Sequence, residues 1–237
     1  MHDPNLPADD QPKRGAVRRF LTWFFSYRSP WMWGVIAIAA FIIGILFWGG
    51  FNWALEATNQ EAFCISCHEM RDNVFAEYRK TVHYSNKTGV RASCPDCHVP
   101  KEWSHKVVRK IQASNELYHK ALGSIDTPAK FNAKRIELSK SVWRAMKTTD
   151  SRECRNCHKF DYMDLSLQEP RASGLHQTAL NQGKTCIDCH QGIAHKLPPK
   201  ATDAYQDMLA HIDQVGPVQK LIDFLQGADV EKAKAAR

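Results

Sequence analysis

Four copies of one short motif constrain this chain more than any other feature of its sequence. Each copy reads Cys-x-x-Cys-His, and together the copies use all eight cysteines of the 237 residues. The pairs are Cys64/Cys67, Cys94/Cys97, Cys154/Cys157 and Cys186/Cys189, followed by His68, His98, His158 and His190. This motif is typical of c-type haem, which is held by two thioethers beside a histidine that can bind the iron. The sequence therefore predicts four covalently bound haem groups.

Two other uses of paired cysteines compete with haem. Two Cys-x-x-Cys pairs can hold one zinc ion, so the eight thiols could form two zinc sites. In an exported protein they could instead form disulfides. Neither use requires a histidine directly after every pair, whereas covalent haem does. The sequence therefore favours haem over both alternatives.

An apolar run near the N-terminus predicts a membrane span. No charged residue occurs among the 27 positions from 29 to 55. As a helix these positions measure roughly 40 Å, against roughly 30 Å for the hydrocarbon layer of a bilayer. Trp31, Trp33, Trp48 and Trp53 lie near its ends, as interfacial aromatic residues do. A cleaved signal peptide would be shorter and would end at small residues, so we expect a retained anchor.

Basic residues before the apolar run predict its orientation. They are Lys13, Arg14, Arg18, Arg19 and Arg28. The positive-inside rule then places the N-terminus in the cytoplasm and the part after about residue 52 in a bacterial periplasm. A net charge of +7 could by itself indicate nucleic acid, anionic lipid or an acidic partner. The position of the charges favours the lipid bilayer of an inner membrane, and we expect no nucleic-acid partner.

The exported part has the pattern of a mostly helical domain with little or no sheet. Segments 103–122 and 130–147 have helical spacing, and prolines interrupt the loops. Long apolar stretches are scarce, so four haems would supply much of the apolar bulk of the core. We expect a basic cytoplasmic segment (1–28), a single transmembrane helix (29–55), a compact tetrahaem domain (56–197) and a C-terminal tail (198–237). In the tail, helical segments 203–215 and 217–226 either dock on a partner surface or form a loosely packed terminus.

The spacing of the motifs indicates an internal duplication. Cys64 and Cys154 are 90 residues apart, and Cys94 and Cys186 are 92 residues apart. We therefore expect two copies of a two-haem unit, over about residues 60–100 and 150–195, in one pseudo-symmetric cluster.

Lone histidines are candidates for the second axial ligand that low-spin haem needs. His83 and His176 occupy matching places in the two halves, and His195 lies five residues after His190. We expect these three to be distal ligands, because bis-histidine ligation is a known pattern at multihaem sites. His105 is a weaker candidate, because it has no counterpart in the second half. We expect the other two histidines of the exported part, His119 and His211, to be structural.

The N-terminal anchor, followed in order by CISCHEM, TVHYSN, CPDCHVPK, DSRECRNCH and TCIDCHQGIAH, resembles the NapC/NirT family of membrane-anchored tetrahaem cytochromes. The resemblance covers roughly residues 15 to 197. It implies a quinol dehydrogenase that oxidises menaquinol or ubiquinol and passes electrons through four haem c groups to a periplasmic reductase. Nitrate reductase with its dihaem subunit is the favoured acceptor. The alternatives are a nitrite, N-oxide or S-oxide reductase as acceptor, or a plain electron-relay cytochrome without a quinol site.

The resemblance also implies roles for single residues. In CISCHEM it makes Met70 the proximal ligand of the first haem, and a thioether, a weaker donor than imidazole, favours ferrous iron. The alternative is that His68 binds the iron and Met70 only packs. It makes Lys110 a hydrogen-bond donor to a quinol oxygen and Glu116 the proton acceptor, at a position where relatives often carry Asp. A solvated helix face is the alternative for this pair.

The distal histidines receive an assignment as well. The resemblance implies that His83 binds the fourth haem and His195 the third. Repeat symmetry would then give His176 to the second haem.

Overall fold

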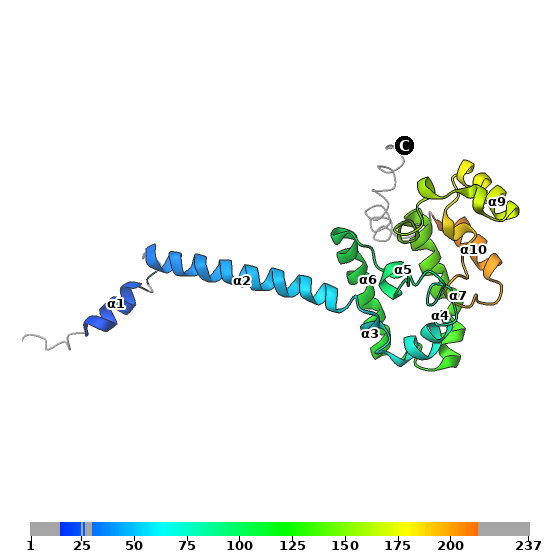
Figure 1. The fold of residues 1–237 in the computed structure, drawn as a ribbon. Helices are drawn as coiled ribbons and strands as arrows, with labels where there is room; N and C mark the ends of the chain where they lie inside the picture. Colours follow the sequence, from blue (N-terminus) through cyan, green and yellow to red (C-terminus); the bar gives the residue numbers. More distant parts are fainter. Residues whose placement is uncertain (1–14, 25, 27–29, 213–237) are drawn as a thin grey trace, which may run out of the picture. The chain divides into compact units, whose positions relative to one another are not determined.

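The computed structural model describes residues 15–24, 26 and 30–212 (Figure 1). The chain divides into two compact units, Met1–Ala54 and Leu55–Arg237. Helices and turns make up the described part, and it contains no strand. The predicted fold class, mostly α with one N-terminal apolar helix, is therefore confirmed.

The first unit consists of helix α1 (Ala16–Phe24) and most of helix α2 (Pro30–Ala57). Within the described residues, α2 alone is long and apolar enough to cross a membrane, with a mean hydropathy of 2.3 in its most apolar stretch. Its apolar side chains are exposed around the whole helix, which suits lipid and not water. Arg18 and Arg19 lie on α1, whereas Lys13, Arg14 and Arg28 are outside the described residues.

The second unit is built around two long helices, α6 (Trp103–Ala121) and α7 (Pro128–Thr148). They correspond closely to the two segments with helical spacing. Gly123, with a φ of +62°, follows the end of α6 in the left-handed conformation that glycine adopts without strain. Thr127 then caps α7, because its hydroxyl accepts a hydrogen bond from the Lys130 N–H at 3.3 Å, and Pro128 occupies the first helical position.

Short helical elements carry the cysteine motifs on either side of this pair. The first half contains α3 (Glu61–Cys64), the π-helix η1 (Met70–Phe75), α4 (Ala76–Tyr78) and α5 (Cys94–His98). The second half contains α8 (Arg152–Arg155), the 3₁₀ turns η2 (Phe160–Tyr162) and η3 (Leu165–Leu167), α9 (Pro170–Asn181), the 3₁₀ turn η4 (Cys186–Asp188) and α10 (Ala201–Ala210).

The main apolar cluster joins α7, η4 and α10. Its members are Trp143, Ile187, Ala201, Ala204, Tyr205 and Met208. The Tyr205 hydroxyl donates a hydrogen bond to Asp188 Oδ1 at 2.7 Å, which ties α10 to the fourth motif. Of the two helical segments expected in the tail, the first therefore packs against the motif-bearing unit. The second, 217–226, lies outside the described residues.

Candidate metal centre

The third and fourth motifs are single helical turns. The Cys154 carbonyl accepts hydrogen bonds from the N–H groups of Cys157 at 3.2 Å and His158 at 2.8 Å. The Cys186 carbonyl accepts the same two bonds, with the same lengths, from Cys189 and His190. Residues three and four apart share one side of a helical turn. Each turn therefore presents two thiols and one imidazole to the same side, as covalent attachment of haem requires.

The second and fourth motifs begin with the same capping arrangement. The N–H and hydroxyl of Ser93 both donate to Asp96 Oδ2, at 2.8 and 2.6 Å. Thr185 makes the same two bonds to Asp188, at 2.6 and 3.0 Å. Our reading of the sequence missed these aspartates, although a Ser or Thr three residues before an acidic residue is a recognisable sign of such a cap.

Thiols of successive motifs lie next to one another. Three neighbouring pairs link the first motif to the second, the second to the third and the third to the fourth: Cys64 with Cys94, Cys97 with Cys157, and Cys154 with Cys186. The first and last of these pairs are hydrogen-bonded, whereas Cys97 and Cys157 are only close enough for their charges to interact. No cysteine is in a disulfide. A structural zinc site needs four ligands gathered at one point, and the described part of the chain holds no group of three or more potential ligand residues.

Cys67 departs from the arrangement of the other predicted haem thiols. Cys64 is the last residue of α3, whereas Cys67 lies after it, at a bend. The Cys67 carbonyl accepts hydrogen bonds from the N–H groups of Met70 and Arg71, both at 3.1 Å. Its backbone therefore belongs to the turn that leads into η1, and not to one compact turn with Cys64. Cys67 is half-buried and, like Cys189, lies outside the three neighbouring pairs. The thioethers of all eight cysteines stay predictions.

Three of the four motif histidines face a second histidine ring. The ring centroids are 6.2 Å apart for His83 and His158, 6.2 Å for His98 and His195, and 6.0 Å for His176 and His190. Two imidazoles on opposite sides of one metal ion each form a metal–nitrogen bond of about 2 Å, and each ring centre lies about 1 Å beyond its nitrogen. The two ring centres are then roughly 6 Å apart. The three pairs therefore fit a haem iron held by two axial histidines.

These pairs differ from the assignment implied by the resemblance and by repeat symmetry. His83 faces the third motif and not the fourth, His195 faces the second and not the third, and His176 faces the fourth and not the second. The two halves are also folded differently here. His176 lies on α9 and closes locally on its own half, whereas His83 lies in a series of turns and faces the other half. Repeat symmetry therefore does not extend to the facing histidines.

Three of these imidazoles, those of His83, His98 and His195, have lowered pKa values, which favours the neutral form that binds a metal. Burial lowers the pKa of His98 to about 4, with smaller effects of His195 and Arg109. Burial also lowers the pKa values of His83 and His195. The Nδ1 atom of His83 is buried without a hydrogen-bond partner. Buried neutral imidazoles of this kind suit an apolar prosthetic group.

Gln168 fixes the tautomer of one of these rings, that of His176. Its Oε1 atom lies 2.6 Å from His176 Nδ1. An amide oxygen can only accept, so His176 carries its proton on Nδ1 and keeps the lone pair of Nε2 free for a metal. Eight residues separate the two positions, and no sequence pattern indicated Gln168.

The histidine of the first motif differs from the other three. His68 is 47% exposed, its Nε2 lies 3.3 Å from Glu69 Oε1, and no histidine ring faces it among the described residues. Met70 is half-buried and begins η1, and π-helical turns often occur at functional sites. Burial would raise the pKa of Glu69, but hydrogen bonds from Lys120 and the backbone outweigh it and lower the pKa. The carboxylate of Glu69 thus contacts both His68 and Lys120.

Lys110, on α6, lies close to the first motif. Its Nζ donates to both the carbonyl and the hydroxyl of Thr58, each at 3.0 Å. The side chain is half-buried, and this burial lowers the pKa of Lys110. The pKa of Cys64 is lowered to about 7, mainly by hydrogen bonding with Cys94 and also by the charge of Lys110. Lys110 is therefore a partly desolvated cation beside the first motif.

Glu116 occupies a more open position on the same helix. Its carboxylate is exposed and accepts a hydrogen bond from Arg109 Nη2 at 2.6 Å. The negative charge of Glu116 also acts on the Cys64 thiol, more weakly than that of Lys110. Arg109 further donates to the His98 carbonyl at 3.2 Å, so it connects this region with the second motif.

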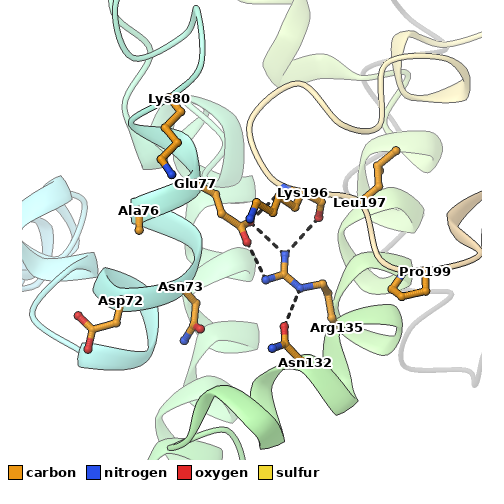
Figure 2. A pocket seen from close by; sticks show the side chains of 10 residues that line it. All are labelled: Asp72, Asn73, Ala76, Glu77, Lys80, Asn132, Arg135, Lys196, Leu197 and Pro199. Atoms are coloured by element: carbon orange, nitrogen blue, oxygen red, sulfur yellow. Dashed lines mark hydrogen bonds and ion pairs between the residues drawn. The ribbon is translucent and has the colours of Figure 1, made fainter.

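An ion pair braces the segment that carries His195. Glu77 and Arg135 form two hydrogen bonds, at 2.8 and 3.0 Å (Figure 2). Glu77 also accepts from the Lys196 N–H at 3.0 Å, and Arg135 donates to the Lys196 carbonyl at 3.1 Å. These residues line a pocket of about 480 Å³. The arrangement holds the residue after His195 between α4 and α7.

The remaining histidines have local partners. His105 is buried, with Nδ1 4.0 Å from Glu102. His119 Nδ1 lies 2.9 Å from the Ser124 hydroxyl, and His211 Nδ1 donates to the Asp207 carbonyl at 2.8 Å. The contacts of His119 and His211 are of the kind that a structural histidine makes, and the role of His105 as a weaker ligand candidate stays a prediction.

Four Cys-x-x-Cys pairs in or beside short helical segments, with facing imidazoles at three of them and an apolar helix before them, define a membrane-anchored multihaem c-type cytochrome. Comparison with known proteins agrees with this class. The chain belongs to the NapC/NirT cytochrome c family, whose N-terminal region matches residues 27–200. No solved structure matches the chain.

Three relatives illustrate the range of the family. The chain is 56% identical to the denitrification system component NirT of Stutzerimonas stutzeri, over 73% of this chain and 87% of that protein. It is 52% identical to the cytochrome c-type protein NapC of Escherichia coli K12, over 78% of this chain and 92% of that protein. It is 48% identical to a protein of Allochromatium vinosum named as a tetraheme cytochrome-c type, over 68% of this chain and 91% of that protein. The protein is therefore an electron-transfer cytochrome with covalently bound haem c.

Proposed function

We propose that the protein oxidises quinol and passes the electrons through four haem c groups to a periplasmic reductase. In this proposal the N-terminus lies in the cytoplasm, α2 crosses the inner membrane and the second unit lies in the periplasm. Menaquinol and ubiquinol are the candidate substrates. The basic residues before α2 and the names of the relatives support it.

The observation that carries the proposal is the position of Lys110. Its ammonium group is bound to Thr58, which directly follows the last residue of α2, and it is close to the first motif. A partly buried ammonium donates strongly to oxygen, because little water competes for it. Lys110 would hold a quinol oxygen at the point where the chain leaves the membrane.

Oxidation of one quinol releases two electrons and two protons. Glu116 is exposed, so it would accept a proton and return it to water. Its hydrogen bond with Arg109 would have to open or rearrange for this transfer. Haem, when bound, supplies one-electron redox chemistry.

The eight motif cysteines would hold four haems by thioethers. His98, His158 and His190 would be proximal ligands, with His195, His83 and His176 as their respective distal partners. At the first motif Met70 would be the proximal ligand, because His68 is turned to Glu69. Cys64 and Cys67 would still hold this first haem, although a bend separates them.

Periplasmic nitrate reductase with its dihaem subunit is the favoured acceptor. A reductase of another nitrogen oxide is the second candidate, because the similarity to NirT is as strong as the similarity to NapC. Mixing the pre-reduced cytochrome with each purified reductase, and following haem re-oxidation, would distinguish the two.

The quinol step is tested by mixing reduced menaquinol and ubiquinol analogues with the purified holoprotein and following haem reduction optically. Lys110→Gln should slow the reduction at least about tenfold while haem content stays unchanged. Lys134→Gln is the matched control, because Lys134 lies on α7 in a surface ion pair with Glu137. No reduction of the fully loaded parent would disprove quinol oxidation and favour the relay cytochrome. Equal rates of haem reduction in the parent and in Lys110→Gln would show that quinol is bound elsewhere in the protein.

A further inference from the structure

Four of the five charged side chains of helix α6 are turned toward the protein, whereas Glu116 is exposed. Its lysine, arginine and glutamate residues are Lys106, Arg109, Lys110, Glu116 and Lys120. Lys106 binds Glu56, Lys110 binds Thr58, and Lys120 binds Glu69, all within the second unit. In a water-soluble domain the apolar side of an amphipathic helix faces the core. The arrangement in α6 is the reverse.

The outer side of α6 carries an apolar stripe of three residues, Ile111, Tyr118 and Leu122. Residues seven and eleven apart differ by about 20° in direction, so all three side chains project to the same side of the helix. They are 67%, 61% and 59% exposed. The neighbouring positions on this side are Ser, Asn, Val and Ala, and none of them is charged.

The stripe points away from the cysteine motifs. Arg109 contacts the His98 carbonyl and precedes Ile111 by two residues. Lys120 contacts Glu69 and follows Tyr118 by two residues. Two residues correspond to a rotation of about 200° in a helix. The His98 carbonyl of the second motif and Glu69, next to the first motif, therefore lie on the opposite side of α6 from the stripe.

We propose that the outer side of α6 lies in the interfacial layer of the lipid bilayer. The covalent chain supports this occupant, because Lys106 and Lys110 bind Glu56 and Thr58, at the point where the only candidate span of the described chain ends. That end lies at the level of the lipid headgroups. A helix with tyrosine and aliphatic residues on one side and lysine and arginine on the other is suited to this layer. The proposal rests on the membrane anchor and not on quinol oxidation.

The test measures the reactivity of a new thiol in the full-length holoprotein, reconstituted in nanodiscs at one copy per disc. With all native cysteines in thioethers, Tyr118→Cys and its control Tyr162→Cys each add one free thiol. Tyr162 is 84% exposed and lies on η2, far along the chain from α6. A membrane-impermeant maleimide should modify Tyr118→Cys at least about tenfold more slowly than Tyr162→Cys, and a lipid-soluble maleimide should reverse the order. Equal rates with the impermeant reagent would overturn the proposal.

A second variant distinguishes whether lipid or protein covers the apolar stripe of α6. Ile111→Asp, added to Tyr118→Cys, places a charge on the stripe and should raise the rate of the impermeant reagent toward that of Tyr162→Cys. Haem content, measured by absorbance, checks that the fold is kept. Protection that persists in this double variant would mean that protein covers the stripe, which would also overturn the proposal.

Discussion

A single side chain can determine which nitrogen of a half-buried imidazole is available to a metal. Gln168 does this for His176, because its amide oxygen fixes the ring proton on Nδ1. No other described histidine of the three facing pairs has a side-chain hydrogen bond of this kind. The fourth motif, which His176 faces, should therefore be the one most sensitive to a single distant substitution.

Gln168→Ala should raise the midpoint potential of one haem, because loss of the acceptor makes His176 a weaker electron donor to iron. The other three potentials should stay unchanged. A redox titration followed by electron paramagnetic resonance measures this directly. Gln177→Ala, next to His176 on α9, is the control, because Gln177 is exposed and donates a hydrogen bond to the Ser173 hydroxyl. Identical titrations of both variants would show that Gln168 has no influence on the metal.

At the first motif two substitutions should give opposite results. Met70→Leu should change the optical and magnetic spectra of one haem, because it removes the proposed thioether ligand. His68→Ala should leave these spectra unchanged, since Glu69 already engages His68. Pyridine haemochrome assays of both variants control for haem attachment. The reverse pattern would show that His68 is the ligand.

Among the elements, the junction of α4, α7 and the segment after His195 depends on one ion pair. Burial would raise the pKa of Glu77, but hydrogen bonds from Arg135 and the Lys196 N–H outweigh it and lower the pKa. A carboxylate with a depressed pKa in the folded state stabilises the fold above its usual value of about 4.3. That stabilisation is lost as the pH falls through the folded-state pKa.

Glu77→Gln should lower stability at pH 7 by about 1–3 kcal/mol, because it leaves Arg135 largely buried without its counter-charge. The difference between parent and variant should begin to shrink as the pH falls below about 4.3, and it should disappear only below the depressed folded-state pKa, where the parent carboxylate is itself protonated. Thermal unfolding followed by circular dichroism, from pH 7 to pH 3.5, tests both statements. A difference that is independent of pH would mean that shape and not charge stabilises this junction.

The elements also show how far sequence reasoning reaches. Helical spacing located α6 and α7 closely, because periodicity depends only on neighbouring residues. The thiol pairs and the histidines that follow them are evident from the motif, because the motif too is a pattern of neighbouring residues. The bend at Cys67 is not evident, because the motif carries no sign of it. The partner of each distal histidine was also hidden. A distance of about 6 Å between His83 and His158 depends on how turns far apart in the chain pack together. Gln168 escaped notice because its contact with His176 follows no sequence pattern.

For the molecule as a whole, the apolar core is small for a unit of this length. The main cluster lies at α7, η4 and α10, away from the first motif. Met208, the large side chain with the least exposure in the described chain, anchors α10. The C-terminal helix is therefore part of the fold that positions the fourth motif.

Met208→Ala should lower the free energy of unfolding by about 2–5 kcal/mol, because it leaves a cavity in this cluster. Denaturant unfolding of the holoprotein, followed by far-ultraviolet circular dichroism, measures the loss. Leu167→Ala, at an exposed position on η3, should change stability by less than about 0.5 kcal/mol. Equal effects of the two substitutions would contradict the placement of the core at α10.

The neighbouring thiols of successive motifs have a consequence for how the protein matures. In an oxidising compartment, thiols as close as Cys64 and Cys94 readily join in a disulfide. Such a bond would link two motifs and consume a thiol that each needs. We therefore expect biogenesis to depend on order: the cysteines must be kept reduced and loaded before the chain closes around them, so the attachment machinery must act on an incompletely folded polypeptide.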